Sequence, residues 1–105
     1  MIKIFDSDID NIDKLIGQKK VIVLYFSASW CGPCKRMHSP LEELSELYAD
    51  RLTILKIDVD DYSDIADDLG IKSLPTFLFY NGGELKYTTK GANIEEFNKN
   101  LNSLL

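Results

Sequence analysis

Cysteine and histidine are scarce in this chain, which has two cysteines and one histidine among its 105 residues. Two cysteines cannot build the framework of several disulfides that holds a small secreted domain together. They also cannot complete a zinc site of four thiolates, and a single histidine does not supply the missing ligands. Asp58, Asp60 and Asp61 lack the glycine and the terminal glutamate of a calcium loop. We therefore expect no metal site.

Positive charge and long apolar runs are also lacking. The chain has 17 acidic and 12 basic residues, a formal net charge of −5 and a pI near 4.7. Nucleic acids and anionic membranes bind basic surfaces, so we expect neither as a partner. The longest apolar run, Val21 to Phe26, is too short to span a bilayer, and residues 1–10 show no apolar core of the secretory type. These features predict a cytoplasmic protein, in which neighbouring cysteines are more often catalytic than structural.

The two cysteines that are present lie close together, in the motif Trp30-Cys31-Gly32-Pro33-Cys34. The run before the motif is rich in β-branched and aromatic residues and predicts a buried strand, whereas the leucines after it recur at helical spacing. The free N–H groups in the first turn of such a helix favour negative charge on Cys31. Pro33 suits that turn because its missing N–H leaves no helical bond unmade. Two thiols at this spacing can open and close a small disulfide ring.

The rest of the chain alternates between strand and helix patterns, without a linker or a repeat. Strands are expected at residues 3–5, 21–26, 52–59, 76–80 and 85–88, with a tight hairpin at 81–83. A first helix is expected from an N-cap at Ser7, with Ile9 on its buried face and Gly17 at its end. Further helices follow the cysteine motif, surround residues 65–69 and begin at Asn93. The order β-α-β-α-β-α-β-β-α predicts one α/β domain over residues 1–105, with a mixed central β-sheet flanked by helices on both faces.

Four separated segments of the chain resemble the thioredoxin family. They are Trp30-Cys31-Gly32-Pro33-Cys34, the lead-in Phe26-Ser27-Ala28-Ser29, Leu74-Pro75-Thr76 and Gly91-Ala92-Asn93. The resemblance covers essentially the whole chain and is closer to the cytosolic eukaryotic branch than to the bacterial one. It implies the thioredoxin fold and a protein-disulfide reductase, which is a thiol-disulfide oxidoreductase of the electron-carrier type. It also implies that no cofactor is bound and that electrons come from NADPH through a flavin-dependent thioredoxin reductase.

The same resemblance implies roles for the residues around the cysteine pair. Cys31 would attack a substrate disulfide and Cys34 would resolve the mixed disulfide, which leaves a Cys31–Cys34 disulfide. Pro75 matches the family's cis-proline, beside which an extended substrate hydrogen-bonds to exposed backbone. A shallow substrate groove would be formed by Trp30, Asp60, Leu74, Pro75, Gly91 and Ala92. The expected partners are thioredoxin reductase and oxidised protein substrates, and we expect a monomer.

One departure from the family pattern lies on the strand before the motif. The family usually buries there an aspartate that is thought to shuttle a proton for the resolving cysteine, and this chain has Tyr25 instead. The lysine that pairs with the aspartate is present as Lys56. Loss of a nearby negative charge lowers the pKa of thiols, so we hypothesise a more acidic Cys31 and a slower resolving step for want of a base. His38, one helical turn after Cys34, is a candidate for the missing base, although a solvated helix histidine is the more common case.

A second departure lies in the helix after the motif. Pro40 comes six residues after Cys34, one residue later than the family's kinking proline, and a π-bulge or a shifted kink could absorb the extra residue. The Tyr25 substitution keeps two alternatives open. One is a thioredoxin-like binding module with relaxed redox turnover, and the other is a more oxidising thiol-disulfide oxidoreductase. Pro33 favours a reductant, because oxidising relatives typically carry a histidine between their cysteines.

Overall fold

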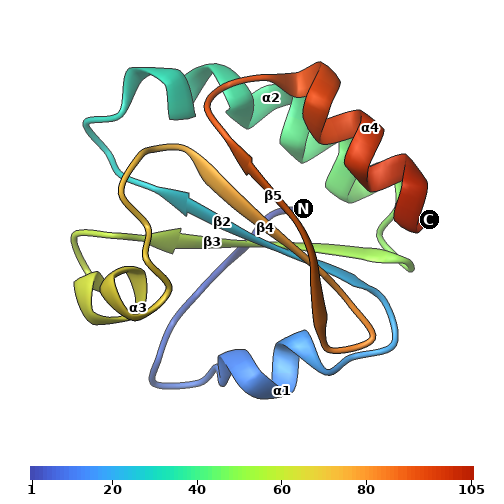
Figure 1. Ribbon diagram of the computed structural model, residues 1–105, viewed down its shortest axis with the longest axis horizontal. Helices are drawn as coiled ribbons and strands as arrows, with labels where there is room; N and C mark the ends of the chain where they lie inside the picture. Colours follow the sequence, from blue (N-terminus) through green and yellow to red (C-terminus); the bar gives the residue numbers. More distant parts are fainter.

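A central sheet of five strands organises the computed structural model, which describes residues 1–105 (Figure 1). The spatial order of the strands is β1-β3-β2-β4-β5. Strands β1, β3 and β2 run parallel, whereas β4 is antiparallel to both β2 and β5. The expected mixed sheet is therefore confirmed. Its strands are β1 (Lys3–Ile4), β2 (Val21–Ser27), β3 (Leu52–Asp58), β4 (Thr76–Asn81) and β5 (Glu84–Lys90).

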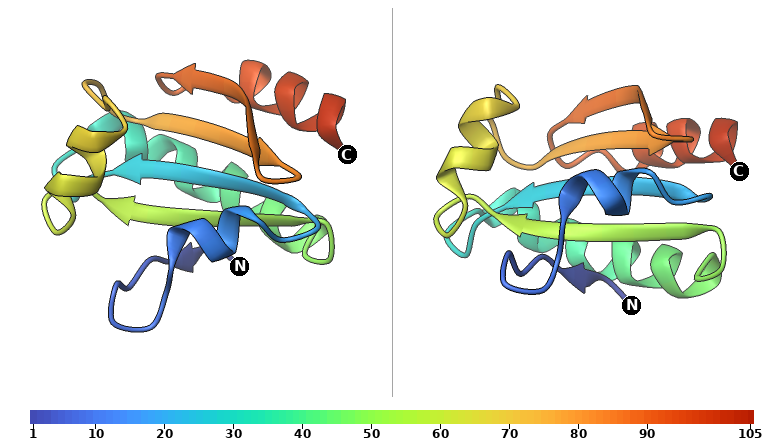
Figure 2. Two further views of the ribbon diagram at one scale, coloured as in Figure 1. Left: turned by 60° about the horizontal axis from the view of Figure 1, so that its bottom comes forward. Right: turned by 90° about the horizontal axis from the view of Figure 1, so that it is seen from below.

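Helices cover both faces of this sheet, as the sequence predicts. They are α1 (Ile12–Ile16), α2 (Gly32–Leu47), α3 (Ser63–Asp68) and α4 (Ile94–Leu104). Helices α2 and α4 lie on one face, and α1 and α3 lie on the other (Figures 1 and 2). None of the four helices has both the length and the apolar character needed to cross a bilayer.

Strand β2 is buried along its whole length because both of its faces meet a hydrophobic core. Val21, Val23 and Tyr25 face the core under α2 and α4. Ile22, Leu24 and Phe26 face the second core, under α1 and α3. A strand covered on both sides is apolar at successive positions rather than at alternate ones, which is the pattern seen here. The core contacts of β2 fix the point at which the chain leaves the sheet and enters the cysteine motif.

The first helix differs from the expectation. Helix α1 begins only after Asn11, whose side-chain oxygen accepts a hydrogen bond from a backbone N–H in the first turn. The prediction of an N-cap at Ser7 is wrong, and Ile9 is exposed outside the helix. The preceding residues instead form a turn in which the Asp6 N–H donates to the Asp10 carboxylate at 3.0 Å. Such local bonds between side chain and backbone compete with helix formation.

The longer helices agree better with the sequence. Helix α4 is capped by Asn93, whose side chain accepts a hydrogen bond from the Glu96 N–H at 3.1 Å. Helix α2 is α-helical from residue 32 to residue 47 and includes Pro40 in its interior. No π-bulge forms, so that part of the expectation is wrong. Met37 and Leu41, on either side of Pro40, both reach the core.

Candidate active site

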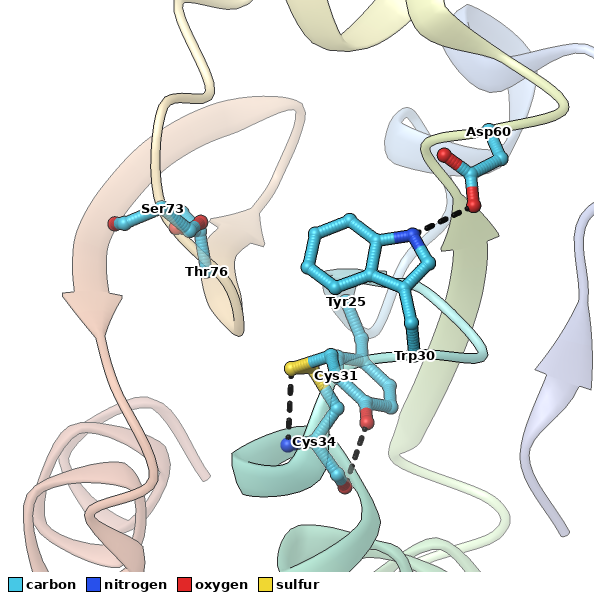
Figure 3. Close-up of a disulfide and its surroundings, with 7 residues drawn as sticks. All are labelled: Tyr25, Trp30, Cys31, Cys34, Asp60, Ser73 and Thr76. Carbon is cyan, nitrogen blue, oxygen red and sulfur yellow. Dashed lines mark hydrogen bonds between the residues drawn. A yellow bond between two sulfur atoms is a disulfide. The ribbon is translucent and has the colours of Figure 1, made fainter.

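The two cysteines form a disulfide at the start of α2 (Figure 3). Their Cα atoms are 5.3 Å apart, and both side chains are nearly buried, with 4% of Cys31 and 2% of Cys34 exposed. Cys31 occupies the N-cap position of α2, and its Sγ accepts a hydrogen bond from the Cys34 N–H at 3.2 Å. In the reduced protein, an N–H aimed at this sulfur stabilises the thiolate over the thiol. The local backbone therefore favours a reactive Cys31.

Tyr25 reaches the cysteine pair from β2 and makes a contact that the sequence analysis missed. Its hydroxyl donates a hydrogen bond to the Cys34 carbonyl oxygen at 3.1 Å (Figure 3). Its ring stacks on Phe77 with the ring centroids 5.0 Å apart. Burial raises the pKa of the Tyr25 hydroxyl above its ordinary value of 10.0. At neutral pH this residue is thus a neutral donor that ties α2 to the sheet, and it cannot replace the aspartate as a base.

The basic residues singled out from the sequence lie close to Tyr25. Lys56 is its partner in the register of β2 and β3, and makes no ion pair. His38 is exposed on α2 and lines the same cavity as Tyr25, Lys56 and Cys34. The structure therefore gathers these residues at one place beside the resolving position. No set of three or more His, Cys, Asp or Glu side chains forms a metal-binding group anywhere in the protein.

Trp30 forms the exposed rim of the site. Two thirds of its surface, 67%, is accessible to solvent. The indole Nε1–H donates to the Asp60 carboxylate at 2.8 Å (Figure 3). Asp60 is itself placed by a turn, in which its N–H donates to the Asp58 carboxylate at 2.8 Å. This chain of contacts holds the large apolar face of the indole beside the disulfide.

Pro75 precedes β4 on the other side of the pair, after a cis Leu74–Pro75 peptide bond. Its carbonyl oxygen accepts a hydrogen bond from the Gly91 N–H at 2.8 Å, and Gly91 has a φ of 90°, a conformation that favours glycine. The loop before β4 is further tied by the Thr76 hydroxyl, which donates to the Ser73 carbonyl oxygen. These contacts fix the backbone around Pro75.

The expected groove residues do not all share one pocket. Trp30 and Leu74 line a hollow of about 260 Å³ together with Val59. The other four expected groove residues, Asp60, Pro75, Gly91 and Ala92, do not line it, and Ala92 packs against the core under α2 and α4. Gly32 is exposed, and no atom comes within 4 Å of the Cβ that a larger residue would add. The surface at Gly32 is therefore open, although the two cysteines beside it are nearly buried.

Comparison with known proteins agrees with this geometry. A family model described as Thioredoxin matches residues 3–103. Thioredoxin-T of Drosophila melanogaster is 37% identical over 92 residues, which are 86% of this chain and 59% of that protein. Thioredoxin of Homo sapiens is 40% identical over 86 residues, 82% of this chain and 81% of that one. The crystal structure of the germline-specific thioredoxin Deadhead of Drosophila superposes over both whole chains with a TM-score of 0.89 at 30% identity. The chain belongs to the thioredoxin family, and its Cys31–Cys34 pair is a centre of thiol–disulfide exchange.

Proposed function

We propose that this protein reduces disulfides in other proteins. The observation that carries the proposal is the position of Cys31, at the N-cap of a helix of 16 residues with an N–H directed at its sulfur. A thiolate is the nucleophile in disulfide exchange, and this position stabilises one. A second candidate, the binding module, is not favoured, because it gives no reason for an intact cysteine pair in this geometry.

The reaction consists of two exchanges. The Cys31 thiolate attacks one sulfur of the substrate disulfide, which forms a mixed disulfide and releases the other substrate sulfur as a thiolate. The Cys34 thiolate then attacks the Cys31 sulfur, which forms the Cys31–Cys34 disulfide and releases the second substrate thiolate. Two electrons pass to the substrate, and protons from solvent neutralise the released thiolates. Cys34 is suited to the resolving role because it lies inside the first turn of α2, close enough to form a disulfide with Cys31 at the N-cap.

Substrate would bind as an extended segment across the open surface beside the pair. The apolar face of Trp30 and the side chain of Leu74 offer contact area on one side. Exposed backbone near Pro75 offers hydrogen bonds, which depend little on the substrate sequence. Gly91 and Ala92 would border the same segment from the opposite side. Recognition of this kind suits a general reductase of oxidised proteins.

The oxidised protein must be recharged by a dithiol donor. By family resemblance, that donor is a flavin-dependent thioredoxin reductase which uses NADPH. We further infer that the chain acts as a monomeric, single domain over residues 1–105 in the cytoplasm. A low cysteine content with one reactive pair is typical of proteins from a reducing compartment.

Insulin reduction tests this function. The protein is assayed with dithiothreitol, then with NADPH and a thioredoxin reductase, and its redox potential is measured by equilibration with glutathione. We expect turnover in both assays and a potential closer to the thioredoxin value of about −270 mV than to about −120 mV, the value of a strong oxidant.

The control variant is Cys31→Ser with Cys34→Ser, which keeps the fold but removes both thiols. This variant should be inactive. Slow turnover of the unmodified protein with a markedly higher potential would contradict the proposal and favour the more oxidising alternative. A biological partner that the double variant still binds and serves would favour the binding module.

A further inference from the structure

A second cavity lies beside the cysteine pair and shares no lining residue with the hollow that contains Trp30. It has a volume of about 400 Å³ and borders Cys34. Three basic residues line it, Lys35 and His38 from α2 and Lys56 from β3. We call this cavity the basic pocket. Nothing in the thiol–disulfide exchange described above uses its basic residues.

The charge of the basic pocket is opposite to that of the protein as a whole. The chain has a formal net charge of −5, yet no carboxylate lines this pocket. The ion pairs of the protein are elsewhere, between Glu42 and the N-terminus, between Lys3 and Asp10, and between Lys86 and Glu84. Neither Lys35 nor Lys56 is in a salt bridge, so two lysine charges border one cavity, and His38 adds a ring N–H donor in either protonation state.

Acidic residues do lie on the other side of Lys56. A separate hollow that Lys56 also borders is lined by Asp6, Asp58 and Asp61. None of the three carboxylates comes within 4.0 Å of the Lys56 ammonium group, so none forms a salt bridge with it. The Lys56 ammonium group therefore has no salt bridge to break before it binds a ligand in the basic pocket.

Neutral donors complete the lining of the pocket. Ser29 lines the pocket, as does Ser27, which is only 2% exposed and whose side chain is hydrogen-bonded to Tyr25. Cys34 and Lys35 at the start of α2 also line the pocket, but their N–H groups are bonded to Cys31 and are not available to a ligand. Phosphate oxygens are bound in proteins by lysine ammonium groups and by neutral N–H and O–H donors.

We propose that the basic pocket binds a phosphate group, either as inorganic phosphate or as part of a small phosphate monoester, next to Cys34. The cavity is larger than a phosphate group, so the organic part of a small ester also fits. A bound dianion close to the pair disfavours the Cys31 thiolate, and by reciprocity phosphate binds the disulfide form more tightly than the thiolate form. The proposed phosphate site does not depend on whether the protein acts as a reductase.

The test is a titration of the oxidised protein with inorganic phosphate. Sodium chloride keeps the ionic strength constant, and amide chemical shifts report binding. We expect saturable changes confined to residues near positions 25–38 and 56. A parallel titration with glycerol phosphate separates the two sources. Tighter binding of the ester indicates a small phosphate monoester, and equal binding indicates phosphate alone. Changes that do not saturate, or that spread over lysines across the surface, would overturn the proposal.

Matched variants separate a site from general charge screening. Lys35→Gln removes an exposed charge at the pocket without disturbing the core, and we expect at least about fivefold weaker phosphate binding. Lys19→Gln removes the same charge from an exposed residue that does not line the pocket, and we expect less than about a twofold change. Equal weakening by the two variants contradicts the proposal.

The coupling to the cysteines has its own measurement. Phosphate affinity is compared between the oxidised protein and the reduced protein at a pH at which Cys31 is ionised. We expect weaker binding to the reduced protein, while Cys31→Ser with Cys34→Ser should bind like the oxidised form. Equal affinity for the oxidised and reduced proteins would show that the pocket is not coupled to the pair.

Discussion

Tyr25 shows how one side chain can change its chemical role while keeping its place in the fold. An aspartate at this position offers a negative charge and a base, whereas Tyr25 offers a ring, one hydrogen bond and a hydroxyl with a raised pKa. Its bond to the Cys34 carbonyl oxygen acts on the backbone of the resolving residue and not on the thiol. We therefore expect the consequences of Tyr25 to be separable into a stability effect and an effect on the thiols.

The stability effect is tested by Tyr25→Phe. This variant keeps the stacking on Phe77 and removes only the buried hydrogen bond, so the free energy of unfolding should fall by about 1 kcal/mol. Urea denaturation of the oxidised protein measures the change. Tyr87→Phe is the matched control, because it removes an exposed bond to Ser103 and should cost less. Equal losses in the two variants would count against a structural role for the Tyr25 hydroxyl.

The effect on the thiols is tested by titration of Cys31 in a Cys34→Ala variant, followed by thiolate absorbance. The pKa of Cys31 should lie below the ordinary cysteine value of about 8.5. The start of α2 favours the thiolate, and no carboxylate at position 25 opposes it. A pKa of about 8.5 or above would contradict this expectation.

At the scale of elements, what could be predicted from the sequence depended on burial. Strand β2 was predictable because both of its faces are apolar, and α4 because Asn93 marks its start and Phe97 and Leu101 its inner face. Helix α1 has five residues, none of them buried, so its boundaries depend on local polar contacts that a periodic pattern does not reveal. A short amphipathic pattern alone therefore overestimates the length of this helix.

In the active site, too, contacts that depend on how elements pack in space could not be predicted from the sequence. The strand-to-helix position of the cysteines follows from the residues on either side of them, and Asp60, which family resemblance places in the groove with Trp30, contacts that residue. The bond from Tyr25 to Cys34 was not predictable, because it depends on how closely β2 approaches the start of α2. A polar-tipped aromatic residue on the inner face of β2, just before the motif, is the only signal of it in the sequence.

The two asparagine caps give a prediction for the helices. Asn93→Ala should lower the free energy of unfolding by about 1 kcal/mol, because α4 contributes buried residues to the core and loses its first hydrogen bond. Asn11→Ala removes an equivalent bond from α1, which has no buried residue, and should cost less. Urea denaturation of both variants gives the comparison. A larger loss from Asn11→Ala would mean that α1 is more tightly coupled to the fold than its burial indicates.

At the scale of the whole molecule, the redox state should change stability. The disulfide joins residues with a sequence separation of 3, and closing so short a loop stabilises a protein by about 2 kcal/mol on the chain-entropy model. Reduction should therefore lower the midpoint of urea denaturation. The variant Cys31→Ser with Cys34→Ser should show no response to reductant. An unchanged midpoint in the unmodified protein would contradict the prediction.

Stability should also fall at high pH. Burial raises the pKa of Tyr25 and of Tyr80 above the ordinary value of 10.0, and for Tyr80 the charge of Asp13 acts in the same direction. Above pH 10 the unfolded chain releases these protons while the native state keeps them, so the free energy of unfolding decreases as pH rises. Tyr25→Phe should make this decrease less steep. An identical pH dependence in the variant and the unmodified protein would exclude Tyr25 as a cause.

Trp30 is the only tryptophan of the chain, and it is fixed by Asp60 next to Cys31. Disulfides quench the fluorescence of an adjacent indole, and dithiols do so much less. Because no second indole contributes a background, the emission of this protein should follow the opening and closing of the disulfide directly. The molecule therefore carries its own optical reporter, and each half of the exchange can be timed by stopped flow without a label.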